Sequence, residues 1–218
     1  MKKRILLTLL VLFFISIRLL AHTVNYDFSA ISKAEAGWIY FQMGFTHILP
    51  YGFDHVLFIL GLFFLNPKVK SILWQATAFT IAHSITLGLA IFGFIHPVSS
   101  IIEPIIALSI LFIAIENILI TELKWWRILI VFGFGLIHGC GFASALTEVG
   151  LPEKNYLLAL LTFNLGVESG QLAVIIFAYF LIGKWFSNKQ WYHSRIVIPA
   201  SFAIGGIALY WTIERTFF

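Results

Sequence analysis

Long apolar runs, separated by short polar breaks, dominate the pattern of this chain. About 20 consecutive apolar residues cross a bilayer as a helix, so each long run predicts a membrane span. After the N-terminal segment we expect six spans, at 54–66 (or from about 44), 71–95, 100–121, 127–147, 156–183 and 196–213. Breaks this short predict adjacent, antiparallel helices. The expected fold class is all-α, a polytopic membrane helical bundle.

Composition narrows the class of protein further. Of the 218 residues, 60% are hydrophobic and 11% are charged, whereas a soluble domain carries about 25% charged residues. A soluble globular enzyme and a disordered chain are therefore excluded. The single cysteine, Cys140, excludes an intrachain disulfide and a Cys-based zinc or iron–sulfur site. The net charge of +4 comes from basic residues scattered in short loops, so we expect no nucleic-acid partner.

The pattern of the N-terminal residues predicts a targeting signal. The basic residues Lys2, Lys3 and Arg4 precede an apolar stretch over 5–17. This arrangement is typical of a signal peptide, and an uncleaved signal anchor is the alternative. We therefore expect a signal peptide or anchor at 1–21, an extracytoplasmic segment at 22–43 and the transmembrane domain at 44–218.

Basic residues in the short loops predict the orientation. One set of loops holds seven of them: Lys68, Lys70, Lys124, Arg127, Lys184, Lys189 and Arg195. The opposite set holds Lys33, Lys154 and Arg215. The richer side is expected to be cytoplasmic. The C-terminus, and the mature N-terminus if residues 1–21 are cleaved, then lie outside the cytoplasm.

Ionisable residues within the spans predict a functional site. Such groups are expensive in a bilayer, so they face the bundle interior. From their positions along the spans, we expect Asp54, His55 and Glu103 in the outer third, and His83, His138 and Glu168 near the midplane. This predicts an outward-open polar cavity that narrows at a ring formed by the second set.

Imidazole nitrogens and carboxylate oxygens suit divalent transition metals such as nickel, cobalt, zinc or iron. The expected metal ligands are Asp54, His55, His83, His138, Glu168 and Glu103. Residues expected to orient them or line a pathway are His47, Thr80, Ser84, Asn164, Gln171 and Glu116. Three plainer interpretations stay open: single histidines that only bridge helices, a packing role for Glu116 with Asn117, and a packing role for Cys140.

Four polar signatures occur in order along the chain, on the first, second, fourth and fifth expected spans. They are His-Ile-Leu-Pro-Tyr-Gly-Phe-Asp-His from His47, Phe-Thr-Ile-Ala-His-Ser-Ile-Thr up to Thr86, Phe-Gly-Leu-Ile-His-Gly-Cys-Gly-Phe from Phe134, and Phe-Asn-Leu-Gly-Val-Glu-Ser-Gly-Gln from Phe163. Over roughly 44–215 the chain resembles the HupE/UreJ family of small bacterial membrane proteins.

That resemblance implies a nickel or cobalt permease of the bacterial inner membrane, often associated with maturation of hydrogenase or urease. It implies that His47, Asp54 and His55 correspond to the family's histidine–aspartate–histidine motif, and His138 to a histidine of its second signature. The chain differs in two features. Six residues separate His47 from Asp54 where the family has five, and the second signature keeps one histidine without the following glutamate.

Two functions remain open on the residues. The first is transport of a divalent cation (nickel, cobalt or zinc) through the intramembrane site, driven by a gradient because the chain has no P-loop. The second is an intramembrane zinc hydrolase acting on a lipid or membrane peptide, although GxSxG and HExxH are absent. A purely structural or accessory membrane subunit is a third possibility. Besides the lipid bilayer and the ion, a homo-oligomer or a metalloenzyme-maturation protein is a possible partner.

Overall fold

The computed structural model describes the backbone of residues 32–149 and 156–218, and the side chains of 32–143 and 156–218. Within these ranges the chain is helical and contains no strand. The helices are α2 (Lys33–Ile48), α3 (Phe53–Leu65), α4 (Val69–Ile91), α5 (Ser99–Leu119), α6 (Arg127–Val149), α7 (Tyr156–Ala178), α8 (Lys184–Phe186) and α9 (Ile198–Phe217). Two π-helical turns, η1 (Tyr179–Gly183) and η2 (His193–Val197), join α7 to α8 and lead into α9. The expected signal peptide or anchor at 1–21 lies outside the described residues.

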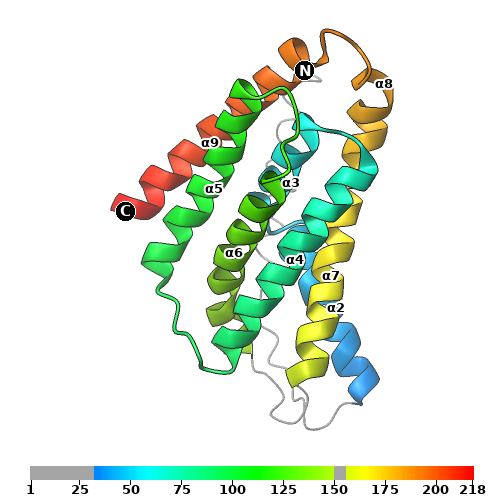
Figure 1. The fold of residues 1–218 in the computed structure, drawn as a ribbon. Helices are drawn as coiled ribbons and strands as arrows, with labels where there is room; N and C mark the ends of the chain where they lie inside the picture. The colour runs from blue at the N-terminus through cyan, green and yellow to red at the C-terminus, as the bar shows by residue number, and fades with distance from the viewer. Residues whose placement is uncertain (1–31, 150–155) are drawn as a thin grey trace, which may run out of the picture.

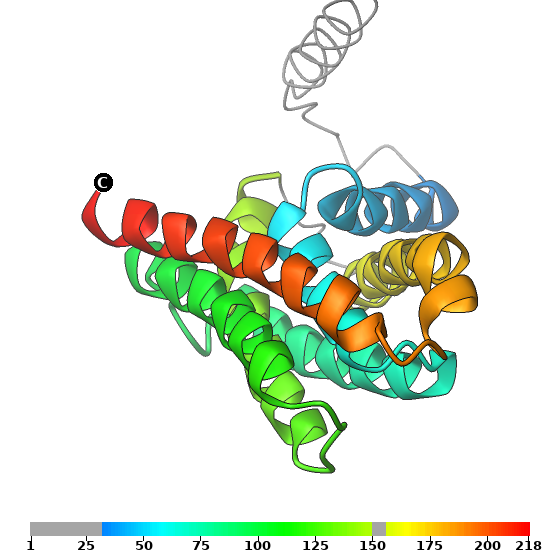
Figure 2. The same ribbon diagram turned by 90° about the horizontal axis from the view of Figure 1, so that it is seen from above.

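The helices form an elongated bundle (Figure 1). Seen along its length, α9 lies beside α5, and α2 lies beside α7 (Figure 2). Helix α4 packs against α6, and α3 contacts α5, α7 and α9 from inside the bundle. This arrangement places the first turn of α3, with the buried His55, inside the bundle.

Within the described residues, four helical segments are long and apolar enough to cross a membrane: Val69–Ile91, Ser99–Leu119, Tyr156–Phe186 and His193–Phe217. Helices α2 and α3 are together long and apolar enough as well, although they are bent by 66° at the break between them. Counted as one, they give a fifth candidate span. In α6 the part with described side chains, Arg127–Ala143, is a shorter apolar helix. The expected all-helical membrane bundle is confirmed, whereas the six spans are confirmed only as four or five.

The first expected span is the one that differs. A span over 54–66, or from about 44, is instead two helices that meet at residues 49–52. Pro50 lacks a backbone N–H and disfavours helical geometry in the residue before it, and Leu49 is extended (φ −127°, ψ 116°). The expected boundary between residues 43 and 44 falls inside α2. Helix α2 begins with a capping box, in which the Ser32 hydroxyl accepts from the Glu35 N–H and the Glu35 carboxylate accepts from the Ser32 N–H.

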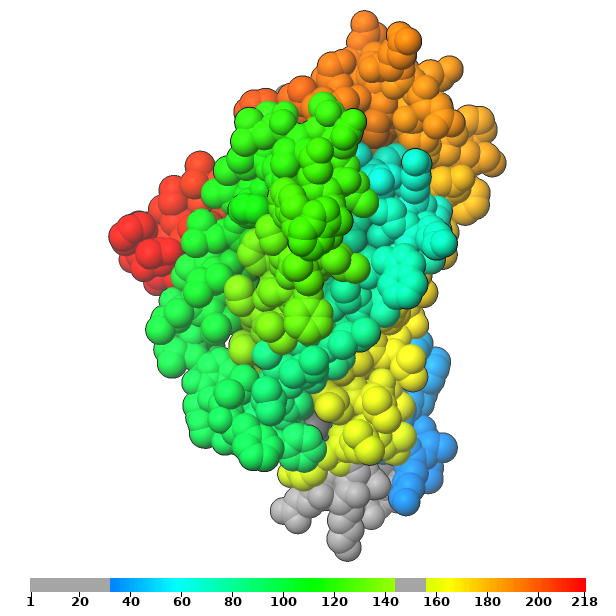
Figure 3. Space-filling model, in the orientation of Figure 1, coloured from blue at the N-terminus to red at the C-terminus, as the bar shows by residue number. Residues whose placement is uncertain are grey.

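Large apolar side chains cover the outside of the bundle. Helices α4, α5, α6 and α7 form one continuous face in the space-filling view (Figure 3). Exposed residues of these helices include Trp74, Ile81, Leu108, Leu129 and Leu161. A water-facing surface would not tolerate so much exposed apolar area, but a lipid-facing surface requires it. The interior, by contrast, holds buried polar residues.

Candidate metal centre

Three histidines from three different helices converge in the bundle. One nitrogen from each of His47, His55 and His83 lies within 4.8 Å of the other two. Their ring centroids are 4.6 Å apart for His47 and His55, and about 6 Å for each with His83 (6.1 Å and 6.0 Å). Separations of this size allow one ion to reach all three nitrogens after small side-chain movements.

A fourth imidazole comes from α6. The ring centroid of His138 is 4.9 Å from that of His55, and the two rings meet edge to face. His138 is 1% exposed and His83 is fully buried. The four histidines therefore form one cluster, built from α2, α3, α4 and α6, and we call it the histidine cluster.

The break between α2 and α3 brings His47 and His55 together. His47 occupies the last turn of α2, and His55 the first turn of α3. Gly52 packs directly on the His47 carbonyl, where a Cβ atom would collide. A continuous helix would place these two histidines about 12 Å apart along its axis, at 1.5 Å per residue. The turn at 49–52 is thus what makes them neighbours.

Glycines set the distance between α4 and α6. Gly139 lies against the His83 carbonyl, and a Cβ on Gly135 would stand 2.6 Å from the Phe79 carbonyl. Small residues at such crossings let two helix backbones approach closely. His138, one residue before Gly139, is thereby carried to the depth of His83.

Hydrogen bonds determine which nitrogen of His55 and His83 is free. The Asp54 carboxylate lies 3.0 Å from His55 Nδ1 and also accepts from the His55 N–H at 2.9 Å. The Asn164 amide oxygen lies 3.4 Å from His83 Nδ1. Because a carboxylate or amide oxygen only accepts, Nδ1 of each ring carries the proton. The Nε2 lone pair of each ring is then available as a ligand.

Ser109 determines which nitrogen of His138 carries the proton, but it does so through Nε2 instead of Nδ1. Its hydroxyl donates to the Ile106 carbonyl at 2.7 Å and lies 3.0 Å from His138 Nε2. Having given its one proton to Ile106, the hydroxyl accepts from Nε2–H. The lone pair of His138 is therefore on Nδ1.

Four ring nitrogens remain buried with no hydrogen-bond partner in the described part of the chain: His47 Nε2, His55 Nε2, His83 Nε2 and His138 Nδ1. Buried polar atoms are almost always satisfied, so such atoms call for an explanation. Four unpaired imidazole nitrogens in one cluster are a donor set suited to a divalent transition metal.

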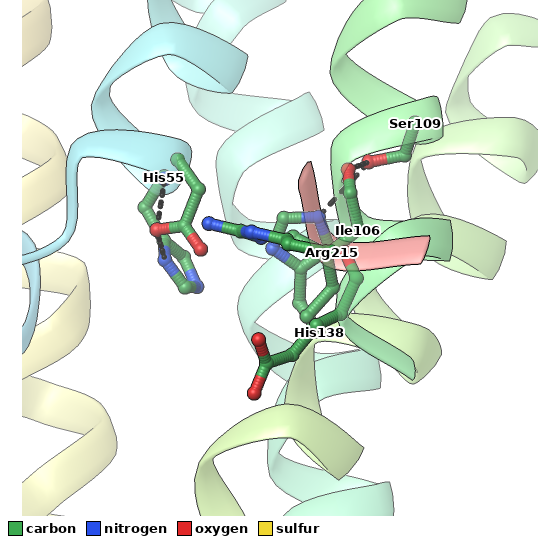
Figure 4. Close-up of polar contacts among 7 residues, drawn as sticks. His55, Ile106, Ser109, His138 and Arg215 are labelled. Atoms are coloured by element: carbon green, nitrogen blue, oxygen red, sulfur yellow. Dashed lines mark hydrogen bonds and ion pairs between the residues drawn. The ribbon is translucent and has the colours of Figure 1, made fainter. Parts of the chain in front are cut away.

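A small cavity leads to the histidine cluster. Its volume is about 150 Å³, and it is lined by His47, Asp54, His55, Glu103, Ile106, His138, Gly141, Phe142 and Arg215. Figure 4 shows Arg215 extending from α9 toward His55, beside His138 and Ser109. We call it the Glu103 cavity, because Glu103 is its exposed acidic residue.

Aromatic side chains close the opposite side of the cluster. The Phe79 ring lies 5.0 Å from His138 and 6.1 Å from His83, and the Phe58 ring lies 5.4 Å from His138. Both phenylalanines are almost completely buried, and their rings are 5.2 Å apart. They separate the cluster from the end of the bundle that holds Glu116 and Arg127.

Two residues lie differently from the arrangement expected from the sequence. His55 was expected nearer the outside than His83 and His138, yet it touches both, because α3 begins in the middle of the bundle. Glu168 was expected in the midplane ring, but its carboxylate accepts from Thr77 at 2.8 Å. Thr77 is six residues before His83, about 9 Å along α4, and Glu168 is absent from the lining of the cavity.

The other expected residues occupy three places. Asp54 and Glu103 line the cavity, and Asn164 contacts His83. Thr80 donates to the Gln171 amide oxygen at 3.1 Å, and Ser84 donates to the Thr80 carbonyl within α4. The Thr80–Gln171 bond therefore joins α4 to α7, and the Ser84 bond stays within α4.

Glu116 belongs to a separate buried network. Its carboxylate pairs with Arg127 at 3.1 Å, and Arg127 also donates to the Asn117 side chain at 3.2 Å. Asn117 donates in turn to the Gly61 carbonyl at 2.7 Å. Arg127, expected as a loop charge, is only 1% exposed. It is a structural ion-pair partner of Glu116, because an unpaired guanidinium could not be buried there.

Sequence reasoning missed two residues near the cluster. Ser109 is the only polar residue between Pro104 and Glu116. A single hydroxyl within such an apolar stretch is the feature that could have identified it as a candidate site residue. Arg215 was counted only as a loop charge, although it lines the cavity. His47 was expected in a supporting role and is instead one of the three converging imidazoles.

One known family matches nearly the whole chain. The chain matches the family described as HupE / UreJ protein over residues 21–215. The chain is a member of the HupE/UreJ family. The match begins well before residue 44, so it includes the whole of α2. The resemblance seen in the sequence began inside that helix, just before His47. No curated protein and no solved structure matched the chain. Family and apolar helices together identify a multi-pass membrane protein.

Proposed function

We propose that this HupE/UreJ protein transports a divalent transition metal ion across the bacterial inner membrane. The observation that carries the proposal is the set of four buried imidazole nitrogens, contributed by four helices, that have no partner among the described residues. A structural role for these histidines would pair both nitrogens of each ring. A ligand role leaves one nitrogen free and fixes the other, as Asp54, Asn164 and Ser109 do.

The donor types narrow the cargo to nickel, cobalt or zinc. Neutral imidazole is a borderline ligand that suits these ions, while magnesium and calcium prefer all-oxygen sites. The HupE/UreJ family points to nickel or cobalt, and zinc fits the same nitrogen set. Asp54 supports His55, and Glu103 stands where an ion would exchange its first waters.

The route runs from the Glu103 cavity to the histidine cluster. The packed rings of Phe58 and Phe79 lie beyond the cluster, which supports a transport cycle with one conformation open only toward the Glu103 cavity. Even with Arg127 buried, six basic residues lie at the loops of the opposite end: Lys68, Lys70, Lys124, Lys184, Lys189 and Arg195. The positive-inside rule therefore makes the Glu103 cavity extracytoplasmic.

Membrane potential is a sufficient driving force for inward movement of a cation. It contributes about 2.3 kcal/mol per charge per 100 mV, hence about twice that for a divalent ion. Protons compete with the metal for imidazole lone pairs, so binding should weaken as the external pH falls through the range in which histidines protonate.

Metal flux into proteoliposomes tests the proposal. Purified protein is reconstituted, and entry of Ni²⁺, Co²⁺ and Zn²⁺ is measured alongside elemental analysis of the same preparation. We expect saturable entry of at least one ion, abolished in His83→Ala and in His138→Ala. His96→Ala is the matched control, because His96 is an exposed residue in the loop before α5. Equal flux in all three variants would reject the histidine cluster as the transport site.

Measurements on the same preparation distinguish transport from the hydrolase alternative. It has no support from the family match, and the closed Phe58–Phe79 side suits an outward-open transporter as well as an enzyme. Stoichiometric, tightly bound zinc without flux of any ion would favour the hydrolase. Metal entry that depends on His83 would favour transport.

A further inference from the structure

Arg215 places a positive charge in the wall of a cavity that we propose for a cation. It lies in the last turn of α9 and lines the Glu103 cavity together with the two carboxylates, Asp54 and Glu103. Its side chain extends toward His55 (Figure 4). A guanidinium in this position opposes the entry of a bare divalent ion, so its presence needs a reason.

The contacts of Arg215 leave most of its donors free. One guanidinium nitrogen donates to the Glu103 backbone carbonyl at 3.3 Å, and the group stacks over Trp211 at 5.2 Å. A guanidinium carries five N–H donors. Among the described residues, no carboxylate lies within ion-pair distance of Arg215, although two carboxylates share its cavity. The free edge is suited to a planar oxyanion, which Arg binds through two parallel hydrogen bonds.

Charge in the cavity points to the same kind of ligand. Asp54, Glu103 and Arg215 together carry one net negative charge, and ligating imidazoles are neutral. A bound divalent cation would reverse this to one net positive charge in the cavity. A monovalent anion on Arg215 would restore neutrality and reduce the cost of burying the ion.

The number of ligands and the space available also agree. The three converging imidazoles, with His138 as a fourth, supply fewer ligands than the six of octahedral nickel. The cavity of about 150 Å³ holds about five waters at about 30 Å³ each. An anion of three or four heavy atoms fits beside a partly hydrated ion, whereas a large chelator does not.

We propose that Arg215 binds a small carboxylate or bicarbonate that completes the coordination of the metal, so that the cargo is a metal–oxyanion pair rather than a bare hydrated ion. This inference rests on the proposed transport function, because it concerns the cargo of the same site. It makes Arg215 a determinant of what enters the cavity.

Equilibrium binding of Ni²⁺ to the purified full-length protein tests the inference. Affinity is measured in bicarbonate-free buffer with sodium formate, with sodium bicarbonate, or with sodium chloride at the same ionic strength. We expect about tenfold tighter binding with either oxyanion than with chloride, the worth of one charge-assisted hydrogen-bonded pair. The visible spectrum of bound Co²⁺ should change when formate replaces chloride, because an oxygen ligand enters the coordination sphere.

Variants of two arginines locate the effect. Arg215→Gln should bind Ni²⁺ equally in formate and chloride, and Arg215→Lys should keep only part of the formate effect. Arg195→Gln is the matched control, because Arg195 also stacks on a tryptophan, at 5.8 Å from Trp191, but lies outside the cavity lining. It should keep the full formate effect.

The other outcomes overturn one claim or both. Ni²⁺ binding by the wild type that is equal in all three salts would overturn the anion site and leave the proposed function intact. Tighter binding by Arg215→Gln with an unchanged formate effect would make Arg215 only a counter-charge of Asp54 and Glu103. No Ni²⁺, Co²⁺ or Zn²⁺ binding in any salt would overturn the proposed function as well. If Arg215→Gln does not fold, the wild-type comparison and Arg215→Lys still decide.

Discussion

Ser109 and His138 face each other across α5 and α6, with the serine hydroxyl 3.0 Å from His138 Nε2. Because that hydroxyl also donates to Ile106, it fixes the proton of His138 on Nε2 and frees Nδ1 toward the cluster. Removing the hydroxyl should let the ring change tautomer and orientation. We therefore predict that Ser109→Ala weakens metal affinity by about 10- to 100-fold, measured by equilibrium binding, and that Ser109→Thr largely retains it.

Ser201→Ala provides the control for this prediction. Ser201 is a fully buried serine on α9 whose hydroxyl has no partner in the described residues, and it contacts no histidine through a hydrogen bond. Its loss should leave metal affinity unchanged. An equal loss of affinity in both variants would mean that Ser109 matters only for packing.

The two carboxylates Asp54 and Glu168 should behave differently, although both were expected as ligands. Asp54 accepts from His55, so Asp54→Asn should weaken metal binding by about 10- to 100-fold. Glu168 accepts from Thr77 away from the cluster, so Glu168→Gln should change affinity by less than about twofold. Metal titration of both variants checks this pair, and the reverse ranking would restore the ring expected from the sequence.

The buried Glu116–Arg127 pair should matter for stability rather than for metal binding. Glu116→Gln would leave the Arg127 charge buried without its partner, which should cost about 3–5 kcal/mol in the free energy of unfolding. Glu122→Gln removes the carboxylate of an exposed pair with Lys124 and should cost less than about 1 kcal/mol. Thermal unfolding in detergent compares them, and similar costs for both would show that Arg127 finds water or another partner.

Gly139 should be intolerant of a methyl group, unlike a glycine on the same helix. A Cβ on Gly139 would collide with the His83 carbonyl and the Thr86 hydroxyl. Gly139→Ala should separate α4 from α6 and reduce both the unfolding temperature and metal affinity. Gly133 has no neighbour within 4 Å of such a Cβ, so Gly133→Ala should be neutral or stabilising by about 0.5–1 kcal/mol. Equal behaviour of the two variants would contradict the close approach at Gly139.

The spans from α4 onward could be predicted to within a few residues, because each is one apolar run between polar breaks. The first span could not, since Pro50 and Gly52 lie within a stretch whose hydropathy alone favours one helix.

The shared depth of His83 and His138 could be predicted from the sequence, but the depth of His55 and the direction of the Glu168 side chain could not. His83 and His138 could be placed midway along their spans, and the structure keeps them in contact with the same neighbour, His55. Glu168 lies on a helix of suitable depth, yet its side chain meets Thr77. The position of a residue along a span follows from counting, whereas the side of the helix that meets a given partner depends on how the helices pack.

The interruption between Ile48 and Phe53 has an electrostatic consequence. A helix end carries about half an elementary charge, negative at the carboxyl end and positive at the amino end. The carboxyl end of α2 lies at His47, where it favours a cation, and the amino end of α3 lies at Asp54, where it favours the carboxylate. One unbroken helix would have neither end inside the bundle. The chain thereby directs partial charges at the cluster without adding an ionised side chain, at a depth where such a side chain is most costly.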